Sequence, residues 1–313
     1  MRAVTIVDGG LAVAERPDPS PAAGEVLVAV RAAGLNNADL IQVRGGYPAP
    51  PGSPQDIPGL ELAGEVVANG AGVTRFTVGD RVMAVVGGGG QAELATVHER
   101  AAMPVPEGVD WVQAGAIPEA YTTAHDALFT QCGLSVGERV LVHGGAGGVG
   151  TAAVHLAASA GARVTATVRT AGLRPAVAAL GATAVAPDEF AGHGPFDVVL
   201  ELVGAPNMAD NLDALATGGR IVVIGVGAGA RADVNLGVLM GKRARISGST
   251  LRARPLEGKA AAARAVEAHV LPLFEGGRHR VPIAAVYPLA EATAAYERFA
   301  AGAKLGKIVL ATP

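Results

Sequence analysis

The sequence predicts an α/β fold in which an all-β first part precedes a doubly wound parallel sheet. Residues 1 to about 115 contain short runs in which apolar and polar residues alternate, the pattern of half-buried strands. From about residue 118 onward, strand-like and helix-like stretches alternate, which favours a parallel sheet with right-handed crossovers. A chain of 313 residues is long enough for two such domains.

The predicted strands of the first part are bounded by Gly, Pro and Asp, which commonly form turns. Residues 45–58 contain five prolines and therefore predict a loop, long enough to lie over a binding cleft. The strands are predicted at 3–7, 25–31, 65–67, 81–85 and 92–97.

The second part predicts a repeated strand–helix unit. A last apolar run at 307–310 predicts a terminal strand that could pair back with the first part. The helices are predicted at 121–130, 151–160, 175–180, 207–215 and 257–274, and the other strands at 139–143, 163–168, 197–202 and 220–224.

A glycine-rich turn is the most informative motif. Gly145, Gly147 and Gly150 form the pattern G-x-G-x-x-G where a predicted strand runs into a predicted helix. One glycine permits the tight turn, one lets the backbone approach a pyrophosphate, and one allows close packing of helix on strand. The helix N-terminus offers free N–H groups to the phosphates. This context predicts a Rossmann dinucleotide site contacted by Gly145, Ala146, Gly147, Gly148, Val149 and Gly150.

The residues after the next predicted strand favour NADPH over NADH. An acidic residue there would hydrogen-bond the 2′-hydroxyl of NADH, whereas arginine accepts the 2′-phosphate of NADPH. Residues 164–170 contain no acid, and Arg169, Thr170 and Arg174 are available. The alternative is that both arginines are ordinary surface residues, because arginine outnumbers lysine in this chain.

Composition excludes several classes of function. The net charge is −3 and there is no basic run, which argues against nucleic acid or an anionic membrane as partner. Cys132 is the one cysteine, so no internal disulfide can form. The first residues resemble a strand rather than a signal peptide, so we expect a cytoplasmic protein. Residues 140–162 carry no acid, Lys or Arg, but their glycine turn favours a buried strand–turn–helix over a membrane span.

Several motifs together resemble the quinone oxidoreductases, the zinc-free branch of the medium-chain dehydrogenase/reductase superfamily. The resemblance covers essentially the whole chain and is strongest to the tumour-suppressor-inducible subgroup, with ζ-crystallin more distant. It implies a GroES-like β domain, an inserted Rossmann domain, NADPH in the interdomain cleft, and a homodimer. The motifs are GLNNADL (34–40), GLELAGEV (59–66), VGDRVMA (78–84), GGGGQAEL (87–94), IPEAYTTAHDAL (117–128), GERVLVHGGAGGVG (137–150) and GKIVL (306–310).

With this resemblance we divide the chain into three segments. Residues 1–117 form the GroES-like catalytic domain and 118–255 the Rossmann NADPH-binding domain. Residues 256–313 return to complete the catalytic domain. The apolar run 245–250 is expected near a sheet edge, where a second copy would cover it.

No metal is expected. The zinc enzymes of the superfamily carry a Cys in a G-x-C-H-x-D pattern and a His in G-H-E. Those positions hold Asn36 and Leu60 here, with Asn37 in place of the adjacent His. Zinc prefers thiolate, imidazole or carboxylate ligands, which Asn and Leu do not supply. The seven histidines also contain no H-x₃-H pair.

The resemblance implies two residues that face nicotinamide and substrate. Asn36 would hold the nicotinamide ribose or orient a substrate carbonyl, and Tyr47 offers a phenol and a flat face to a quinone. The alternatives are that Asn36 forms a turn and that Tyr47 is a half-buried aromatic. Asp39 is expected to cap a helix, Glu61 and Glu65 to be structural, and Glu119 to offset a helix dipole.

The resemblance also implies cofactor contacts outside the glycine turn. We expect the hydroxyl of Thr122 near the nicotinamide amide. The remaining expected contacts are Val203, Gly204, Gly225, Val226, Gly227, Ser249, Thr250, Leu251 and Lys307.

The leading functional hypothesis is a zinc-independent, NADPH-dependent reductase of a quinone or enone, with Tyr47 or water as the proton donor. A 2-enoyl thioester reductase is the second. It would want basic residues at the cleft mouth, and the sequence offers only Arg252 and Arg254 after the last strand of the sheet. The third is a non-catalytic, crystallin-like NADPH-binding protein, against which the intact glycine turn argues.

Overall fold

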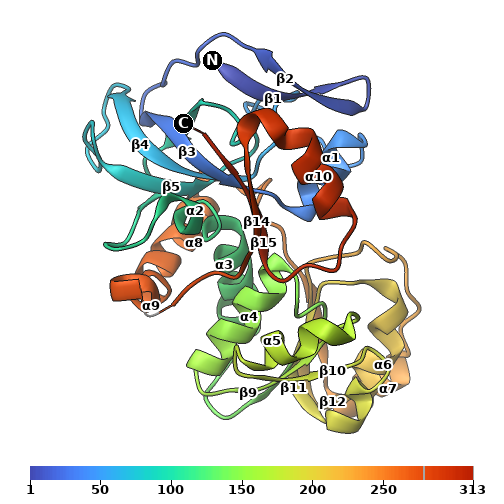
Figure 1. Cartoon of the computed structure of the whole chain (residues 1–313). Coiled ribbons are helices and arrows are strands. Elements are labelled where there is room, and N and C mark those ends of the chain that lie inside the picture. The colour runs from blue at the N-terminus through green and yellow to red at the C-terminus, as the bar shows by residue number, and fades with distance from the viewer. Residues whose placement is uncertain (278, 313) are drawn as a thin grey trace. The chain divides into compact units, whose positions relative to one another are not determined.

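The computed structural model describes residues 1–277 and 279–312 and contains two compact units (Figure 1). Unit 1 comprises Met1–Thr122, Leu251–Gly302 and the chain from Lys307 onward, and unit 2 comprises Thr123–Thr250 and Ala303–Gly306. Arg278 and Pro313, which the sequence assigns to the return segment, lie outside the described residues. Both units combine helices with sheet, which confirms the predicted α/β class.

Unit 1 is built on a seven-stranded sheet of order β14-β15-β3-β4-β5-β7, with β6 also paired to β3. The terminal strand β15 is antiparallel to β3 and parallel to β14, so the end of the chain does pair back with the first part as predicted. The strands are β3 (Glu25–Gly34), β4 (Glu61–Asn69), β5 (Arg81–Val85), β6 (Leu94–His98), β7 (Ala102–Pro104), β14 (Ile283–Pro288) and β15 (Lys307–Ala311), beside a hairpin of β1 (Arg2–Val7) and β2 (Gly10–Glu15).

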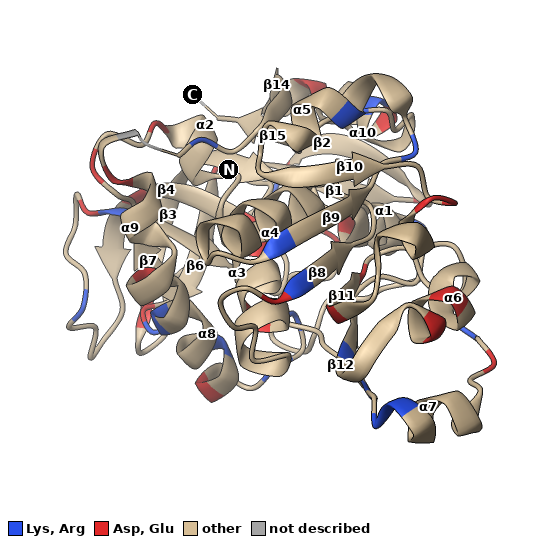
Figure 2. Ribbon diagram, turned by 90° about the horizontal axis from the view of Figure 1, so that it is seen from below, with Lys and Arg blue, Asp and Glu red and all other residues tan. Residues whose placement is uncertain are grey.

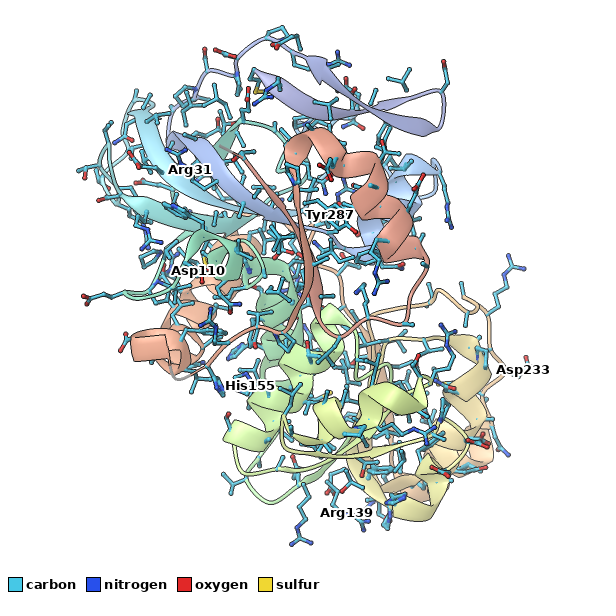
Figure 3. All side chains as sticks on the ribbon, viewed as in Figure 1. Arg31, Asp110, Arg139, His155, Asp233 and Tyr287 are labelled. Atoms are coloured by element: carbon cyan, nitrogen blue, oxygen red, sulfur yellow. The ribbon has the colours of Figure 1, made fainter. Side chains whose placement is uncertain are left out.

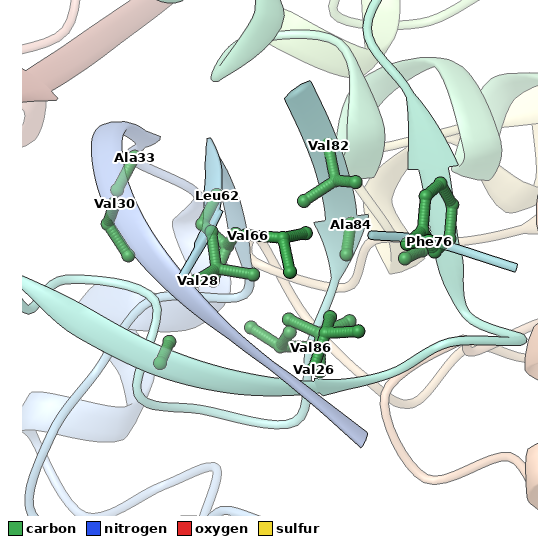
Figure 4. Packing of buried hydrophobic residues seen from close by; sticks show 13 residues of the cluster. Val26, Val28, Val30, Ala33, Leu62, Val66, Phe76, Val82, Ala84 and Val86 are labelled. Carbon is green, nitrogen blue, oxygen red and sulfur yellow. The ribbon is translucent and has the colours of Figure 1, made fainter. Parts of the chain in front are cut away.

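The apolar residues that alternate with polar ones along the sequence lie together on one buried face of this sheet. Val26, Val28 and Val30 of β3 are buried and pack with Leu62 and Phe76 in a single cluster (Figure 4). Each fully buried side chain of this size contributes about 1.5–3 kcal/mol through removal of apolar surface from water. A second cluster of unit 1 joins β15 to helix α10 (Ala292–Ala300), with Tyr287 of β14 packed against it (Figure 3).

Unit 2 is a six-stranded parallel sheet of order β10-β9-β8-β11-β12-β13. In chain order this is 3-2-1-4-5-6, the order of the Rossmann fold, which confirms the predicted doubly wound sheet. The strands are β8 (Arg139–Val142), β9 (Arg163–Thr167), β10 (Ala182–Val185), β11 (Phe196–Glu201), β12 (Leu215–Val223) and β13 (Arg245–Gly248). The helices are α4 (Gly148–Ser159), α5 (Arg174–Ala178), α6 (Met208–Asp213) and α7 (Leu236–Lys242).

The structure differs from the sequence prediction at several elements. Helices α1 (Asn37–Val43) and α2 (Trp111–Ala114) interrupt the part predicted as all β. Each begins at a polar cap, and the Asp110 carboxylate that caps α2 accepts from Gln113 N at 2.8 Å (Figure 3). The predicted strands do not include β2, β7, β10 or β14. The predicted helix 257–274 is two helices, α8 (Leu256–His269) and α9 (Leu271–Phe274), because Pro272 cannot continue a helix.

The remaining segments are short. The predicted helix 121–130 is α3 (Pro118–His125) followed by a π-helical turn, Asp126–Gln131. Single 3₁₀ turns occur at Ala171–Leu173, Phe190–His193, Ala205–Asn207, Glu275–Gly277 and Leu289–Glu291. The apolar stretch 140–162 forms the predicted strand–turn–helix of β8 and α4. Within residues 1–277 and 279–312, every helix is too short or too polar to cross a bilayer.

Candidate functional site

The glycine turn of unit 2 connects β8 to α4, with Gly147 as the N-cap of the helix. A Cβ at Gly150 would overlap the carbonyl oxygen of Gly144, and one at Gly145 would lie 2.8 Å from Ala166 Cβ. These glycines therefore allow the helix to start directly against the strands. A Cβ at Gly147 would meet only the Gly144 carbonyl, at 3.4 Å, so this position is open. The first N–H groups of α4 have no acceptor within the helix and are free to bind an anion.

The other predicted cofactor residues of unit 2 lie at the same edge of its sheet. Thr170 and Arg169 follow β9, the Val203–Gly204 pair follows β11, and Gly225 follows β12. Because these strands are parallel, their carboxyl ends share one edge, which is where open α/β sheets bind ligands. A Cβ at Gly225 would overlap the carbonyl of Leu202, so glycine is required for this close approach. Val226 and Gly227 continue that loop.

The two arginines proposed for the 2′-phosphate differ in their surroundings. Arg169 is exposed, and Arg174 is half-buried with its Nε donating to Val168 O at 3.2 Å. In the part of the chain that the structure describes, neither guanidinium has an ion pair with a carboxylate. Both retain charge that a phosphate could neutralise.

A buried carboxylate that the sequence analysis missed holds the Val203–Gly204 loop. Glu201, with no exposed surface, ends β11, and its Oε1 accepts from Val203 N at 2.6 Å and Gly204 N at 2.8 Å. Its Oε2 accepts from Asn211 Nδ2 at 2.7 Å and Asn207 Nδ2 at 3.2 Å. The sequence signal that could have identified Glu201 is an acidic residue at the end of an apolar strand. A carboxylate buried there requires hydrogen-bond donors from nearby residues.

His143 extends this network to the glycine turn. Its Nε2 lies 2.6 Å from Asn211 Oδ1 and 3.8 Å from Glu201 Oε2, and its Nδ1 lies 3.1 Å from Thr167 Oγ1. The same Thr167 hydroxyl accepts from Gly144 N at 3.3 Å. Burial lowers the pKa of His143, although the Glu201 charge opposes the shift. One network therefore joins the ends of β8, β9 and β11.

In unit 1, a buried ammonium group fixes Asn36. Lys307 is 2% exposed, and its Nζ donates to Asn36 Oδ1 at 2.6 Å and Leu35 O at 2.8 Å. It also pairs with Glu61 Oε1 at 2.6 Å, and that oxygen accepts from Asn36 Nδ2 at 2.9 Å. The other Glu61 oxygen accepts from Glu119 N at 2.8 Å. Asn36 is thus held between a cation and an anion, an arrangement that the sequence analysis did not foresee.

Asn36 is the N-cap of α1, and Asp39 forms the capping box with it, which confirms the expected capping role of Asp39. Asp39 is the third helical residue, and its carboxylate accepts from Asn36 N at 2.8 Å and from Gly59 N at 3.2 Å. Burial raises the pKa of Asp39 to about 7. The carboxylate therefore ties the start of α1 to Gly59, two residues before β4.

Tyr47 stands at the start of the proline-rich loop, half-buried, and Arg252 packs on it. The guanidinium lies 5.0 Å from the centre of the Tyr47 ring and donates to Tyr47 O at 2.8 Å. It also donates to Gly87 O at 2.7 Å and to Gln42 Oε1, so Arg252 joins the loop to α1 and to the tetraglycine run. Burial raises the pKa of the Tyr47 phenol, which keeps it protonated at neutral pH. Arg252 is 2% exposed, so it does not form a basic cleft mouth.

The remaining predicted residues fall in both units. Thr122 ends unit 1 and is 3% exposed, and its hydroxyl has no hydrogen-bond partner among the described residues. In unit 2, Ser249 Oγ donates to Asp126 Oδ2 at 2.9 Å, and Thr250 ends the unit. Leu251 begins the return to unit 1 and is buried.

The chain is similar in sequence to known dehydrogenases and quinone oxidoreductases. Residues 22–107 match the family model of the alcohol dehydrogenase GroES-like domain, and residues 177–310 match that of the zinc-binding dehydrogenase. A quinone oxidoreductase of Rattus norvegicus is 32% identical over 304 residues, which cover 93% of this chain and 90% of that protein. The spectinabilin polyketide synthase system protein NorB of Streptomyces orinoci is 35% identical, over 95% of this chain but 14% of that protein.

Solved structures of related proteins have the same fold as this chain. The crystal structure of an alcohol dehydrogenase superfamily protein from Novosphingobium aromaticivorans is 29% identical in sequence and covers all of both chains with a TM-score of 0.88.

The two central glycines are expected to have separable roles. Gly150→Ala places a methyl group against the Gly144 carbonyl and should lower the free energy of unfolding by about 1–3 kcal/mol. Gly147→Ala places a methyl group no closer than 3.4 Å to the Gly144 carbonyl oxygen and should leave that free energy within about 1 kcal/mol, yet weaken the binding of a pyridine nucleotide about tenfold by obstructing the phosphate. Urea unfolding and calorimetric titration measure the two effects. Equal loss of stability in both variants would contradict this assignment.

Stability should depend on pH through His143. Because the folded-state pKa of His143 is lowered, its contribution is complete above the unfolded pKa of 6.5 and is lost as the pH falls below it. Between about pH 7 and about pH 5, the wild-type free energy of unfolding should fall by about 1 kcal/mol more than that of His143→Gln. Urea titrations of both proteins across this range provide the measurement, and parallel curves would refute the expectation.

Proposed function

The chain belongs to the quinone oxidoreductase family of the medium-chain dehydrogenase/reductase superfamily, and from that premise we propose that it reduces a quinone or a related enone with NADPH. The glycine cradle between β8 and α4 is the observation that carries the proposal, because at this sheet edge a Cβ at Gly150 would overlap the Gly144 carbonyl. Overall homology supports an oxidoreductase that acts on a small molecule. The quinone and the preference for NADPH are our proposal.

The residues present fit a pyridine nucleotide. NADPH would supply the hydride when bound. The backbone of Gly145–Gly150 would bind the pyrophosphate, and Arg169 and Arg174 the 2′-phosphate. The Thr122 hydroxyl, which has no hydrogen-bond partner among the described residues, would bond the nicotinamide amide. The further contacts proposed are Val203, Gly204, Gly225, Val226, Gly227, Ser249, Thr250 and Leu251.

We propose that the reaction proceeds without zinc, although one matching family model is described as zinc-binding. At the positions where the zinc enzymes carry Cys and His, this chain has Asn36 and Leu60. The Lys307 ammonium lies 2.6 Å from Asn36 Oδ1, and a fixed cation there repels a second one. In the described part of the chain, no three His, Cys, Asp or Glu side chains are grouped to hold a metal. These residues do not fit a catalytic zinc site.

Asn36 and Tyr47 are the proposed positioning groups for the substrate. Both ends of the Asn36 amide are bonded, to Lys307 and to Glu61, so the amide keeps one orientation. Tyr47 presents a phenol that remains protonated at neutral pH and can donate a hydrogen bond to the acceptor oxygen. The resemblance of the sequence implies Lys307 as a cofactor contact. In this proposal, Lys307 instead acts by orienting Asn36.

The similarity to part of a polyketide synthase protein favours a second candidate, a 2-enoyl thioester reductase. Arg252 does not support that candidate, because its guanidinium is buried and bonded to protein oxygens. The intact glycine cradle also favours an enzyme over a non-catalytic, crystallin-like role. We further propose a homodimer formed at β13, the edge strand of the unit 2 sheet, and hydrodynamic mass tests this state.

Turnover with alternative acceptors tests the proposed reaction. The absorbance of reduced nicotinamide is followed with 1,4-benzoquinone, 9,10-phenanthrenequinone or crotonyl-CoA, each with and without EDTA. We expect the larger kcat/KM with a quinone and no effect of EDTA. Turnover confined to crotonyl-CoA would support the thioester reductase, and loss of activity in EDTA would contradict the zinc-free proposal.

The relative affinity for NADPH and NADH tests whether Arg169 binds the 2′-phosphate. Arg169→Ala should raise the Kd for NADPH about tenfold and leave that for NADH unchanged, because only NADPH carries the 2′-phosphate. Arg163→Ala is the matched control, since Arg163 is also exposed but lies at the opposite end of β9. Equal affinity of the Arg169 variant and the wild type for NADPH would remove Arg169 from the site.

A further inference from the structure

The strand order of unit 2 changes direction between β8 and β11. In the sheet, β8 lies between β9 and β11 (Figure 2). The chain continues from β8 to β9 and β10 on one side and then crosses to β11 on the other side. Open α/β sheets bind their ligands at such a switch point, outside the carboxyl ends of the strands. A side-chain network that links the carboxyl ends of β8 and β11 therefore lies beside the expected ligand.

Glu201, the last residue of β11, holds the loop on one side of this switch point. It has no exposed surface, and its Oε1 accepts from Val203 N at 2.6 Å and from Gly204 N at 2.8 Å. The loop after β12 packs directly on this loop. A Cβ at Gly204, whose φ is +118°, would lie 2.6 Å from Gly229 O, and Ala205 N donates to that oxygen at 2.9 Å. The Glu201 carboxylate therefore fixes two neighbouring loops at the carboxyl edge of the sheet.

The other Glu201 oxygen receives a chain of hydrogen bonds whose direction follows from the chemistry of each group. Asn211 Nδ2 donates to Glu201 Oε2 at 2.7 Å, since a carboxylate only accepts. The amide oxygen of Asn211 therefore faces the other way, toward His143 Nε2 at 2.6 Å. Because an amide oxygen also only accepts, His143 carries a hydrogen on Nε2.

The remaining ring nitrogen of His143 extends the chain to the glycine turn. His143 is 1% exposed, and burial lowers its pKa, so the neutral ring has a single N–H. With that hydrogen on Nε2, the Nδ1 atom accepts from the Thr167 hydroxyl at 3.1 Å. The Thr167 oxygen in turn accepts from Gly144 N at 3.3 Å. Every hydrogen bond from Gly144 to Glu201 therefore has its donor on the side away from the carboxylate.

We propose that Glu201 is a positioning residue for a bound pyridine nucleotide, because it holds the loop after β11 directly and orients the glycine turn through this chain. Hydrogen bonds in a chain with one direction strengthen each other, and those to an ionised group are about twice as strong as neutral ones. The inference rests on the proposed function, in which the glycine turn and the Val203–Gly204 loop contact the cofactor. It adds that one buried charge sets both.

Glu201→Gln tests the charge with little change of shape. The glutamine oxygen can still accept from Val203 N and Gly204 N, but a neutral acceptor holds them less strongly. The glutamine NH₂ then faces Asn211, whose amide turns round to accept, so the hydrogen on His143 moves to Nδ1. We expect the Kd for NADPH and the Kd for NADH both to rise about tenfold, because the change affects the loops and not the 2′-phosphate. Calorimetric titration measures both constants.

Glu138→Gln is the matched control. Glu138 also lies in unit 2, but immediately before β8, at the opposite end of that strand from the glycine turn. Its carboxylate likewise accepts from a backbone group, Ser135 N at 2.8 Å, and it pairs with Arg220 at 2.7 Å. This variant should lose stability in urea yet keep both Kd values. An equal rise of the Kd values in Glu138→Gln, or unchanged values in Glu201→Gln, would overturn the proposal.

NMR of the nitrogen-labelled histidine rings measures the direction of the chain, since ring nitrogens with and without hydrogen differ in chemical shift. His143→Gln identifies the His143 signals by their loss. We expect the hydrogen on Nε2 in the wild type and on Nδ1 in Glu201→Gln. A hydrogen on Nδ1 of the wild-type ring at neutral pH would overturn the derived chain.

Thr167→Val provides a second variant that leaves Glu201 and its loop intact. It removes the hydroxyl between His143 and Gly144 while keeping nearly the same shape. We expect the Kd values for NADPH and NADH to rise about threefold, because the glycine turn loses its link to the chain. Unchanged values would overturn the link between Glu201 and the glycine turn.

Steady-state kinetics separate this inference from the proposed function. Glu201→Gln should raise the KM for NADPH about tenfold and leave the KM for the quinone unchanged. If no quinone or enone is reduced while Glu201→Gln still weakens dinucleotide binding, the positioning role stands and the proposed function fails. If quinones are reduced but Glu201→Gln leaves the KM for NADPH unchanged, the proposed function stands and the positioning role fails.

Discussion

The buried ion pair of Lys307 and Glu61 is the interaction on which the arrangement of unit 1 depends. Glu61 lies on β4, Lys307 on the last strand, and their contact at 2.6 Å joins segments that are far apart in the sequence. Breaking such a pair by removing one partner leaves an uncompensated buried charge, which typically costs about 3–5 kcal/mol. The pair also binds Asn36, so the stability of unit 1 and the orientation of a proposed site residue rest on the same contacts.

In unit 2, a buried carboxylate likewise holds segments together, at the carboxyl edge of the sheet. Glu201 has no exposed surface, and it accepts hydrogen bonds from Val203, Gly204, Asn207 and Asn211, which lie on the loop, 3₁₀ turn and helix that follow its strand. Through Asn211, His143 and Thr167, this charge is linked to the glycine turn. A carboxylate buried in an apolar interior needs hydrogen-bond donors for both of its oxygens. Here the donors belong to the segment after β11, which we propose lies beside the bound nucleotide.

The cationic residues show how burial changes a chemical role. Arg252 and Lys259 lie near each other in sequence, but Arg252 has its donors bonded to protein oxygens, whereas Lys259 lines a pocket. The Arg252 guanidinium therefore fixes the Tyr47 loop, whereas Lys259 has no ion pair with a carboxylate among the described residues. The number of positive residues in a segment does not reveal this difference, because it depends on which acceptors the fold places beside each one.

The sequence by itself determined the two folding patterns, the glycine turn and the family. Period-two alternation in β3 and the repeated strand–helix units are local patterns, and the G-x-G-x-x-G spacing has one structural use between a strand and a helix. Only the tertiary structure decided the partners of the buried charges. Lys307 meets Asn36 across 271 positions of the chain, and His143 meets Asn211 across 68. No local pattern encodes such pairs, since the sheets bring their members together and the low dielectric interior then makes their contacts strong.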